Sequence, residues 1–496
     1  MKFISSLFVL SLLTLLLTAP IQLDSTTQVF KDSQNRERFF HGVNVVYKSS
    51  PFHPNPSGPL TSDSFSLEDI ENLESWGFNI IRLGTMWPGM EPERAKYNTT
   101  YLDIIETIVN TSADHGIYSL LDFHQDVYSP KYCGEGIPLW ASITGDDAWN
   151  FPRPIQWTPF NISSEGLPSD ADCSSFAWAT FYLTSATGSA FQNLYDNYDG
   201  IQDSLGIFWQ KIAERFYLND DVIGYELINE PWAGDHISNP LRMIPGYADK
   251  YNLGPMYDNL NTYIRKIDDQ HIVFFEPVTW DDFIPMGFDH APGGDVFANR
   301  SAISYHYYQL PCLNLKWEIS ARQRDQNRLK VGSICTEFDI FTGNFNDISQ
   351  SLDIFDEYLQ SWIGWDYKNG NFYYDNFTAK DDYIKVVSRT YAQAVSGRTK
   401  SMKFDSSTRD FNLVFEACAE CGETEIYLNE DMHYEGGFDV DVNDVSLEWY
   451  QPKKNRIHLR NKHNAKVMNG KEINLSVKRK NHGTNTILVE ESEFLN

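Results

Sequence analysis

The sequence predicts an α/β fold: a closed (β/α)8 TIM barrel followed by a C-terminal antiparallel β-sandwich domain. Three observations support this prediction. The chain has 496 residues, enough for a barrel of about 250 residues or more and a smaller second domain. Short apolar segments alternate with segments of helical spacing, as the strands and helices of a barrel do. Beyond residue 400, apolar residues recur at every second position, which is typical of antiparallel strands.

The predicted barrel strands are short apolar runs of the kind that a buried barrel core needs. They cover residues 39–46, 78–83, 118–123, 222–228, 272–276, 303–306, 330–336 and 361–365. A capping box at residues 66–69 opens the first helix, and residues 101–115 form the second. Residues 201–216 form a strongly periodic helix, and a final helix at about 382–395 is expected to close the barrel.

Two segments depart from this alternation. Residues 127–199 form a long irregular insertion rich in Trp, Pro, Gly and Ser, and loops of this length in compact domains are usually functional. Residues 396–400 are predicted to be a linker. We therefore divide the chain into a signal peptide at residues 1–20, the barrel at 21–397 and the β-sandwich domain at 398–496.

The amino terminus predicts export. A lysine precedes a short apolar core at residues 3–18, and small residues follow it, as in a secretory signal peptide. The alternative, a membrane anchor, fits less well because the apolar run is short for a membrane span. Six sequons, at Asn98, Asn110, Asn161, Asn299, Asn376 and Asn474, fit a glycoprotein. We therefore expect a secreted, extracellular or lysosomal protein.

The six cysteines are an even number, which suits disulfides in an oxidising compartment. Cys133 and Cys173 flank one long loop. Residues 418 and 421 form a C-x-x-C, for which a local disulfide is favoured over a redox site. Cys312 and Cys335 remain as a third candidate pair, and the sequence leaves the connectivity open.

The formal net charge of −28 argues against nucleic acid as a partner. One strip differs, because residues 451–480 hold ten Lys or Arg and a single acidic residue, Glu472. Such a strip could make peripheral contact with an anionic membrane surface. The alternative, an ordinary solvated face, is favoured.

Two predicted strands lead directly to a glutamate. Glu230 follows the strand at 222–228, and Glu337 follows the one at 330–336. The carboxyl ends of barrel strands meet at one face, where the active sites of such barrels lie. Paired carboxylates are the catalytic groups of glycoside hydrolysis, and a separation of about 5–5.5 Å allows a retaining mechanism. We therefore predict that Glu337 is the nucleophile and Glu230 the acid/base.

Four motifs carry a resemblance to a known family. They are Ile-Arg-Leu-Gly at 81–84, Leu-Asp-Phe-His-Gln-Asp at 121–126, Ile-Asn-Glu-Pro-Trp-Ala-Gly-Asp at 228–235 and Cys-Thr-Glu-Phe at 335–338. In these motifs the chain resembles the endoglycoceramidases, a branch of glycoside hydrolase family 5. The resemblance runs from about residue 41 to residue 368, and the following β domain also fits the family's layout. Asn-Glu-Pro alone would indicate only the wider hydrolase clan.

The resemblance implies further residues that bind substrate or hold the two glutamates: Lys48, Arg82, His124, Asp126, Asn229, His306, Tyr308 and Trp365. Arg82 would lie beneath Glu337 and favour its charged form. Lys48 and Asp126 would bind sugar hydroxyls, and Asn229 would contact the sugar 2-hydroxyl, a bond that can tighten in the transition state.

The remaining roles rest on the same resemblance. His124 would bond to substrate hydroxyls or to the carboxylates. His306 and Tyr308 match the family's His-x-Tyr, whose tyrosine would bond to the nucleophile, although neighbouring tyrosines leave the register open. Trp365 would stack on a sugar ring, and Trp362 competes for that role.

The implied activity is retaining hydrolysis of the bond between the oligosaccharide and the ceramide of a glycosphingolipid. No cofactor or metal is expected, because the two candidate histidines lack a third ligand at the right spacing. The aromatic residues between 140 and 181, together with Trp232 and Phe338, are candidates for an apolar slot for ceramide. The sequence gives no oligomeric state.

Three kinds of alternative stay open. A glucosylceramide-cleaving β-glucosidase, or an endogalactosylceramidase specific for 6-gala-series lipids, would share every catalytic motif. A β-glucanase of the same family is less favoured, because the Trp-Ala-Gly and His-Gln-Asp segments are typical of the glycolipid branch. A non-catalytic protein that binds carbohydrate or lipid is the third alternative, and the intact Glu230 and Glu337 argue against it.

Overall fold

The computed structural model describes residues 20–145, 150–279, 284–308, 314–340, 343–368 and 371–480. The predicted signal peptide therefore lies outside the described residues, apart from its last position. Over these described ranges, no helix is both long and apolar enough to cross a membrane.

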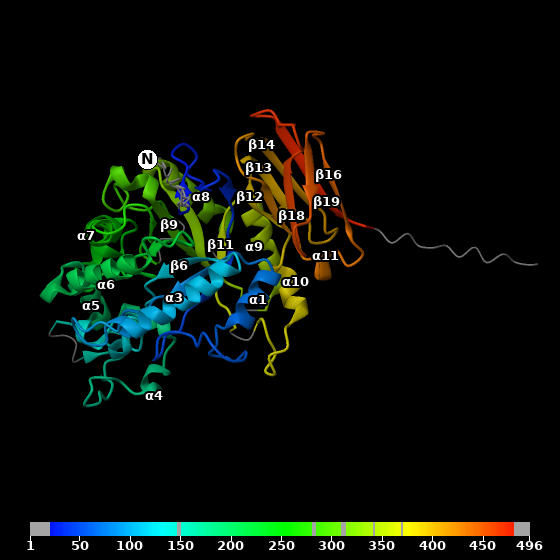
Figure 1. Cartoon of the computed structure of the whole chain (residues 1–496). Coiled ribbons are helices and arrows are strands. Elements are labelled where there is room, and N and C mark those ends of the chain that lie inside the picture. Colours follow the sequence, from blue (N-terminus) through cyan, green and yellow to red (C-terminus); the bar gives the residue numbers. More distant parts are fainter. Residues whose placement is uncertain are drawn as a thin grey trace, which may run out of the picture.

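Parallel strands form a closed barrel, which confirms the predicted fold class (Figure 1). Its strands are β4 (His41–Val45), β5 (Ile80–Gly84), β6 (Tyr118–Asp122), β7 (Val222–Glu226), β8 (Ile272–Phe275), β9 (Ser301–Tyr307), β10 (Gly332–Phe338) and β11 (Trp362–Gly364). β11 pairs with β4 and closes the ring. All the strand residues except Tyr118 are buried, which explains why the strands are largely apolar without a regular alternation of polar residues.

Helices lie around the outside of the barrel (Figure 1). They are α1 (Leu67–Ser75), α2 (Trp87–Met90), α3 (Thr99–Asp114), α4 (Asp170–Cys173), α5 (Ser185–Tyr195), α6 (Ile201–Phe216), α7 (Gly254–Arg265), α8 (Leu315–Leu329), α9 (Phe345–Glu357) and α10 (Asp381–Val387). The predicted capping box opens α1, where Asp69 accepts a hydrogen bond from the Ser66 backbone at 2.7 Å. α6 buries Leu205, Phe208 and Ile212 on one face, as its periodicity predicts.

The prediction of a single helix at 382–395 is wrong in its second half. The chain leaves α10 at Val387 and forms a strand, β12 (Tyr391–Val395). Every residue of β12 is buried, so its sequence lacks the alternation that marks a half-exposed strand. Pairing with two other strands, rather than local spacing, decides its conformation.

The second domain consists of two antiparallel sheets with a shared apolar core. One sheet has the order β13 (Gly397–Phe404), β14 (Phe411–Ala417), β19 (Glu472–Arg479) and β16 (Phe438–Val442). The other has the order β1 (Gln22–Leu23), β2 (Phe30–Lys31), β3 (Glu37–Arg38), β12, β15 (Thr424–Tyr427), β18 (Arg456–Asn461) and β17 (Leu447–Tyr450). A short helix, α11 (Glu430–His433), follows β15. Phe411, Leu413 and Phe415 alternate into the core, as the period of two predicts.

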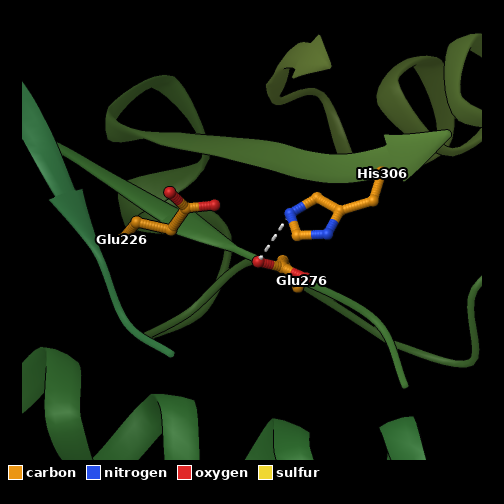
Figure 2. A group of neighbouring side chains, drawn as sticks. All are labelled: Glu226, Glu276 and His306. Atoms are coloured by element: carbon orange, nitrogen blue, oxygen red, sulfur yellow. Dashed lines mark ion pairs between the residues drawn. The ribbon is translucent and has the colours of Figure 1, made fainter. Parts of the chain in front are cut away.

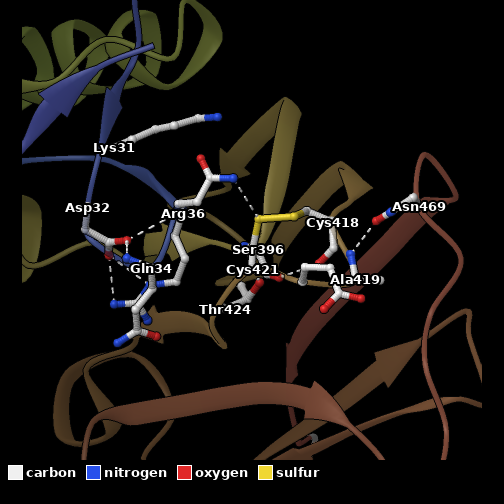
Figure 3. The surroundings of a disulfide bond; sticks show 12 residues. Lys31, Asp32, Gln34, Arg36, Ser396, Cys418, Ala419, Cys421, Thr424 and Asn469 are labelled. Atoms are coloured by element: carbon white, nitrogen blue, oxygen red, sulfur yellow. Dashed lines mark hydrogen bonds and ion pairs between the residues drawn. A yellow bond between two sulfur atoms is a disulfide. The ribbon is translucent and has the colours of Figure 1, made fainter. Parts of the chain in front are cut away.

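Residues 22–38 join this second domain. β3 pairs with β12, and Arg36 beside β3 forms an ion pair with Glu425 of β15. The turn between β2 and β3 lies next to the disulfide between Cys418 and Cys421 (Figure 3). Asn35 in this turn donates to the sulfur of Cys421 at 3.5 Å. The seven-stranded sheet therefore contains strands from both before and after the barrel.

Two disulfides occur within the described ranges. One joins Cys133 to Cys173 across the long insertion, and the other joins Cys418 to Cys421. The third candidate pair includes Cys312, which lies outside the described residues, so that pairing stays a prediction.

We expect the two disulfides to contribute unequally to stability. Cys133 and Cys173 are 40 positions apart, whereas Cys418 and Cys421 are 3 apart, and a longer closed loop restricts the unfolded chain more. The chain-entropy relation gives about 4 kcal/mol for the first and about 2 kcal/mol for the second. Guanidinium unfolding of the two double-serine variants measures both losses, and equal losses would contradict the expectation.

The basic strip at residues 451–480 is largely compensated by acidic neighbours. Seven of its ten cationic side chains form ion pairs of 3.8 Å or less: Lys453 with Glu74, Lys454 with Asp431, Arg460 with Glu448, Lys466 with Glu420, Lys471 with Asp444, Arg479 with Glu435 and Lys480 with Asp439. Exposed pairs add little stability, but they cancel the local charge. This arrangement favours an ordinary solvated face over a site for an anionic membrane.

Candidate active site

The two predicted catalytic glutamates lie at the same end of the barrel. Glu230 follows β7, and Glu337 is the last residue but one of β10. A carboxylate oxygen of Glu230 lies within 4.8 Å of one of Glu337. This upper bound is compatible with the ~5–5.5 Å between the carboxyl groups of retaining glycosidases, and it lies below the ~6.5–9.5 Å that inverting enzymes need for a water molecule.

Arg82 of β5 holds the predicted nucleophile. It is fully buried, and its Nη1 donates to Glu337 Oε1 at 2.7 Å. Its Nε donates to Glu226 Oε2 at 2.5 Å, and its Nη2 lies 3.1 Å from Asp122 Oδ1 and 3.5 Å from Glu276 Oε1. Burial alone would lower the pKa of Arg82, but these carboxylates raise it well above its ordinary value. Arg82 is therefore a permanent cation that compensates the charge of Glu337.

The structure distinguishes Tyr308 from its neighbouring tyrosines. Its hydroxyl donates to Glu337 Oε2 at 2.7 Å, so that both oxygens of the nucleophile are held. Tyr305 and Tyr307, in contrast, belong to the apolar core. Burial and the charge of Glu337 raise the pKa of Tyr308 well above its ordinary value, which keeps the hydroxyl protonated as a donor.

We expect Tyr308→Phe to lower kcat about 10- to 100-fold, because a hydrogen bond to a charged group contributes about 1.5–3 kcal/mol. The phenyl ring preserves the packing, so thermal unfolding should change little. Steady-state kinetics with an aryl lactoside, beside a thermal melt, measures both. A large drop in melting temperature with unchanged kcat would mean that the hydroxyl is structural.

Glu230, the predicted acid/base, is more accessible than Glu337. Its side chain is 15% exposed, compared with 5% for Glu337. Its Oε1 lies 2.8 Å from His306 Nδ1, and its backbone N–H donates to Glu276 Oε2 at 3.1 Å. Its φ of +40° lies in the left-handed region, which residues other than glycine rarely adopt. The neighbouring side chains therefore hold Glu230 in an unusual backbone conformation.

Asn229 and Gln125 fix the loop that carries the acid/base. Asn229 Oδ1 accepts from Arg82 Nη2 at 2.8 Å, and its Nδ2 donates to the Gln125 carbonyl at 2.9 Å. Gln125 Nε2 donates to the carbonyls of Asn229 and Glu230 at 2.7 and 2.9 Å. Gln125 thus belongs to the site, although the sequence singled it out only as part of its motif. The contact of Asn229 with a sugar 2-hydroxyl stays a prediction.

A second charged cluster lies beyond β6 at the mouth of the barrel. Lys48 forms ion pairs with Asp126 and, at 3.2 Å, with Glu135. His124 Nδ1 lies 2.8 Å from Asp122 Oδ2, and its Nε2 lies 3.3 Å from Asp126 Oδ2. Burial alone would lower the pKa of His124, but the charge of Asp122 raises it to about 9. Lys48, His124 and Asp126 therefore lie together, and their sugar contacts stay predictions.

Trp365, rather than Trp362, lies among the site residues. Its ring stacks on His124 at 5.2 Å between centroids, and Lys48 Nζ lies 4.8 Å from its centroid. Trp362 is fully buried and packs edge-on against Phe338. Stacking of Trp365 on a sugar ring stays a prediction.

The predicted ceramide slot needs one correction. Phe338 does not line a slot, because it packs in the core against Phe355 and Trp362. Trp232 stacks on Tyr182 of the long insertion, with 5.1 Å between ring centroids. The insertion therefore packs directly against the loop that carries the acid/base.

Three carboxylates of the site, Asp122, Glu226 and Glu276, are not among the predicted residues. Asp122 and Glu226 end β6 and β7, and Glu276 follows β8. They share the signal that selected Glu230 and Glu337, an acidic residue at the carboxyl end of a predicted strand. Asp122 also lies within the motif at 121–126, but the sequence indicated no separate role for any of the three.

Among the residues that the structure describes, two groups of side chains have the composition of metal ligands: Glu226, Glu276 and His306, and Glu230, His306 and Glu337. Figure 2 shows the first group: Glu226 of β7, Glu276 directly after β8 and His306 of β9. The guanidinium of Arg82 already bonds to Glu226 and lies 3.5 Å from Glu276. The positive charge that a cation would supply is therefore already present, and the cluster is better suited to sharing protons.

Comparison with known proteins gives the family. Residues 58–371 match the model of the cellulases of glycosyl hydrolase family 5, and residues 389–477 match that of the glycoside hydrolase family 5 C-terminal domain. An endoglycoceramidase from Hydra vulgaris is 45% identical over 434 residues, which cover 85% of this chain and 83% of that protein. One from Cyanea nozakii is 44% identical over 499 residues, covering 95% and 98%.

The fold comparison agrees. The solved structure of endo-glycoceramidase II from Rhodococcus sp. in complex with ganglioside GM3 superposes with a TM-score of 0.71 at 21% identity, over 92% of this chain and 100% of that one. The family model spans more than half of the chain, and both relatives align along most of their length. The chain therefore belongs to the endoglycoceramidases of glycoside hydrolase family 5.

Proposed function

We propose that this protein hydrolyses the β-glycosidic bond between the oligosaccharide and the ceramide of glycosphingolipids, releasing the intact glycan and ceramide. The observation that carries this proposal is the pair of glutamates, with oxygens of Glu230 and Glu337 within 4.8 Å of each other. Two relatives at 44–45% identity that bear the name endoglycoceramidase support the choice of bond.

In the first step, Glu337 attacks the anomeric carbon, and the bond from that carbon to the ceramide oxygen breaks. The electron pair stays on the ceramide oxygen, which takes the proton of Glu230. Arg82 and Tyr308 each hold one oxygen of Glu337 at 2.7 Å and so orient the nucleophile. The products are ceramide and a glycosyl ester of Glu337.

In the second step, Glu230 is a carboxylate and takes a proton from water. The water oxygen attacks the anomeric carbon, and the bond to Glu337 breaks, which regenerates both glutamates. Two displacements retain the anomeric configuration. The partial exposure of Glu230 gives that water a route to the acid/base.

The sugar side of the site combines opposite charges with an aromatic ring. Lys48 donates hydrogen bonds and Asp126 accepts them, and the two side chains are ion-paired. Neighbouring sugar hydroxyls both donate and accept, so this pair can bind two of them. Trp365 beside Lys48 supplies an apolar face for the sugar ring.

The lipid side of the proposal includes peripheral contact with membranes or micelles. The long insertion exposes large apolar side chains, among them Trp157 at 78% and Trp178 at 52%. Exposed aromatic residues of this kind suit a lipid surface better than water. The insertion also packs on Trp232, two positions after the acid/base, which supports a role of the insertion in lipid contact.

We further propose a secreted or lysosomal location. The asparagines of all six sequons lie on exposed positions: Asn98, Asn110, Asn161, Asn299, Asn376 and Asn474. Glycan attachment needs such exposure. A mobility shift after enzymatic removal of N-glycans from protein expressed in a eukaryotic host tests this proposal, and no shift would contradict it.

Product analysis tests the function. The protein is incubated with ganglioside GM1 and, separately, with glucosylceramide. Free intact GM1 oligosaccharide and ceramide are the expected products. Cleavage of glucosylceramide alone would instead indicate a β-glucosidase, and saturable binding of either lipid without cleavage would indicate a binding protein.

A further inference from the structure

One buried glutamate of the site, Glu276, has no part in the two steps above. It follows β8, and both of its carboxylate oxygens face the acid/base apparatus. Oε2 accepts the backbone N–H of Glu230 at 3.1 Å, and Oε1 lies 3.4 Å from His306 Nε2. Glu276 therefore acts on Glu230 in two ways: directly, through the backbone N–H of Glu230, and indirectly, through the imidazole ring of His306.

His306 connects the two glutamates. Its Nδ1 lies 2.8 Å from Glu230 Oε1, and its Nε2 faces Glu276 along the dashed line in Figure 2. A neutral imidazole carries one N–H, and its other nitrogen accepts. When the hydrogen is on Nε2 and directed at Glu276, Nδ1 presents its lone pair to Glu230. In that arrangement Glu230 must be the donor, which means that it carries a proton.

We propose that Glu276 is a positioning residue for the acid/base: it holds His306 in the Nε2–H form and fixes the backbone of Glu230. Carboxylates elsewhere set the tautomer of an imidazole in the same way. The consequence is that Glu230 is protonated and oriented before the bond to the leaving group breaks. This inference rests on the hydrolysis proposed above.

The same arrangement assists the second step. Once Glu230 has given its proton to the leaving oxygen, its carboxylate faces the lone pair of His306 Nδ1. Two acceptors at 2.8 Å repel each other, and a proton on Glu230 Oε1 restores the hydrogen bond to Nδ1. The proton comes from the attacking water, whose oxygen goes to the anomeric carbon. Glu276 and His306 end each cycle with the protons they had at its start.

Charged and titratable groups face this pair from every neighbouring strand: Arg82 of β5, Glu226 of β7, Glu230 after β7, Tyr308 after β9 and Glu337 of β10. Burial alone would lower the pKa of His306, but Glu276 and Glu337 raise it well above its ordinary value. Burial raises the pKa of Glu276, against the attraction of His306. With the first hydrogen on Nε2, the second proton lies between Nδ1 and Glu230 Oε1, so His306 and Glu230 share it at a pH where a histidine in water has lost it.

Glu226 offers a matched comparison. It is as deeply buried as Glu276 and ends the adjacent strand, but its hydrogen bond goes to Arg82 at 2.5 Å. Replacing Glu226 disturbs the support of the nucleophile. Replacing Glu276 disturbs mainly the support of the acid/base, because Glu276 lies farther from Arg82, at 3.5 Å. The losses of activity in the Glu226 and Glu276 variants should therefore depend differently on the leaving group of the substrate.

The test uses Glu276→Gln, Glu276→Asp and Glu226→Gln with two substrates of the same sugar, lactosylceramide and 4-nitrophenyl β-lactoside. Nitrophenolate leaves without protonation, whereas ceramide needs a proton from the acid. For Glu276→Gln we expect kcat/KM to fall about 100-fold with lactosylceramide and less than about 5-fold with the aryl lactoside. For Glu226→Gln we expect similar losses with both substrates.

The pH profile gives a second readout. Glu276→Gln removes a negative charge that raises the pKa of His306, so the shared proton is lost at lower pH. We therefore expect the basic limb of kcat/KM to move to lower pH. Glu276→Asp retains the charge and should keep the basic limb near that of the wild type, even though the shorter side chain lowers kcat/KM.

Equal losses with both substrates for Glu276→Gln, together with an unmoved basic limb, would overturn the inference. Thermal unfolding verifies that each variant folds. If Glu276→Gln does not fold, Glu276→Asp decides: a larger loss with lactosylceramide supports the inference, and an equal loss overturns it. A wild-type protein that cleaves neither substrate refutes the proposed hydrolysis itself, whereas an active wild type with no leaving-group difference in the variants refutes only the role of Glu276.

Discussion

Glu337→Gly lowers kcat on a glycosphingolipid by about 10⁵-fold, because without the nucleophile no glycosyl ester forms. Added azide restores cleavage of an aryl β-lactoside by this variant and yields α-lactosyl azide, since azide enters from the face that Glu337 occupied. For Glu230→Gly, azide instead attacks the glycosyl ester of Glu337 and yields β-lactosyl azide. Nuclear magnetic resonance of the two products assigns each role.

The same experiment can contradict the assignment. A β-azide from Glu337→Gly would exchange the two roles, and activity near the wild-type level in either variant would exclude that glutamate from the chemistry. Glu214→Gln is a suitable control, because Glu214 lies on the outer helix α6 with a 42% exposed side chain. Its kcat should equal that of the wild type.

Arg82→Met is expected to have the largest effect on stability. Four carboxylates, on Asp122, Glu226, Glu276 and Glu337, lie within 3.5 Å of the buried guanidinium. Removing it leaves them close together without a counter-charge, and breaking a buried ion pair costs about 3–5 kcal/mol. Guanidinium unfolding measures this loss, and Arg82→Lys should lie between the variant and the wild type, because lysine keeps the charge but not the forked geometry.

The loss of unfolding free energy in Arg82→Met should depend on pH. In the variant, the folded protein relieves the repulsion by binding protons that the unfolded chain binds only at lower pH. Its stability relative to the wild type is therefore lowest at neutral pH and recovers as the pH falls towards 5. A deficit that is the same at both pH values would indicate lost packing instead. Arg94→Met, which removes an exposed ion pair with Asp199, is the control and should cost less than about 1 kcal/mol.

The barrel was predictable because each of its strands is buried on both faces. A short apolar run between polar turns is then a clear signal, as in β7 and β10. The same property is the reason for the wrong prediction at β12. Complete burial removes the alternation of apolar and polar residues that would distinguish a strand from a helix. What distinguishes them is the partner strand β3, which precedes the whole barrel in the chain.

The sequence was sufficient to predict the site residues whose own side chains perform the chemistry. Glu230 and Glu337 follow from strand ends and motifs, but the choice of Tyr308 over Tyr305 depends on which side of β9 faces Glu337. A shift of one residue along a strand reverses the direction of every side chain. The role of Glu276 depends on the direction of two carboxylate oxygens, which no spacing in the sequence encodes.

The three short strands at the start of the chain have a consequence for synthesis. Residues 22–38 leave the ribosome before the barrel, yet their sheet is completed only after the whole barrel and β12 have been made. At about 5–20 residues per second, that interval is on the order of tens of seconds. During this time β3 is an unpaired edge, which is the kind of strand that pairs wrongly with other chains. One truncated variant begins after residue 38, and another ends before β12. In each of them one of the paired strands, β3 or β12, permanently lacks its partner. We expect both variants to aggregate when the full-length chain does not.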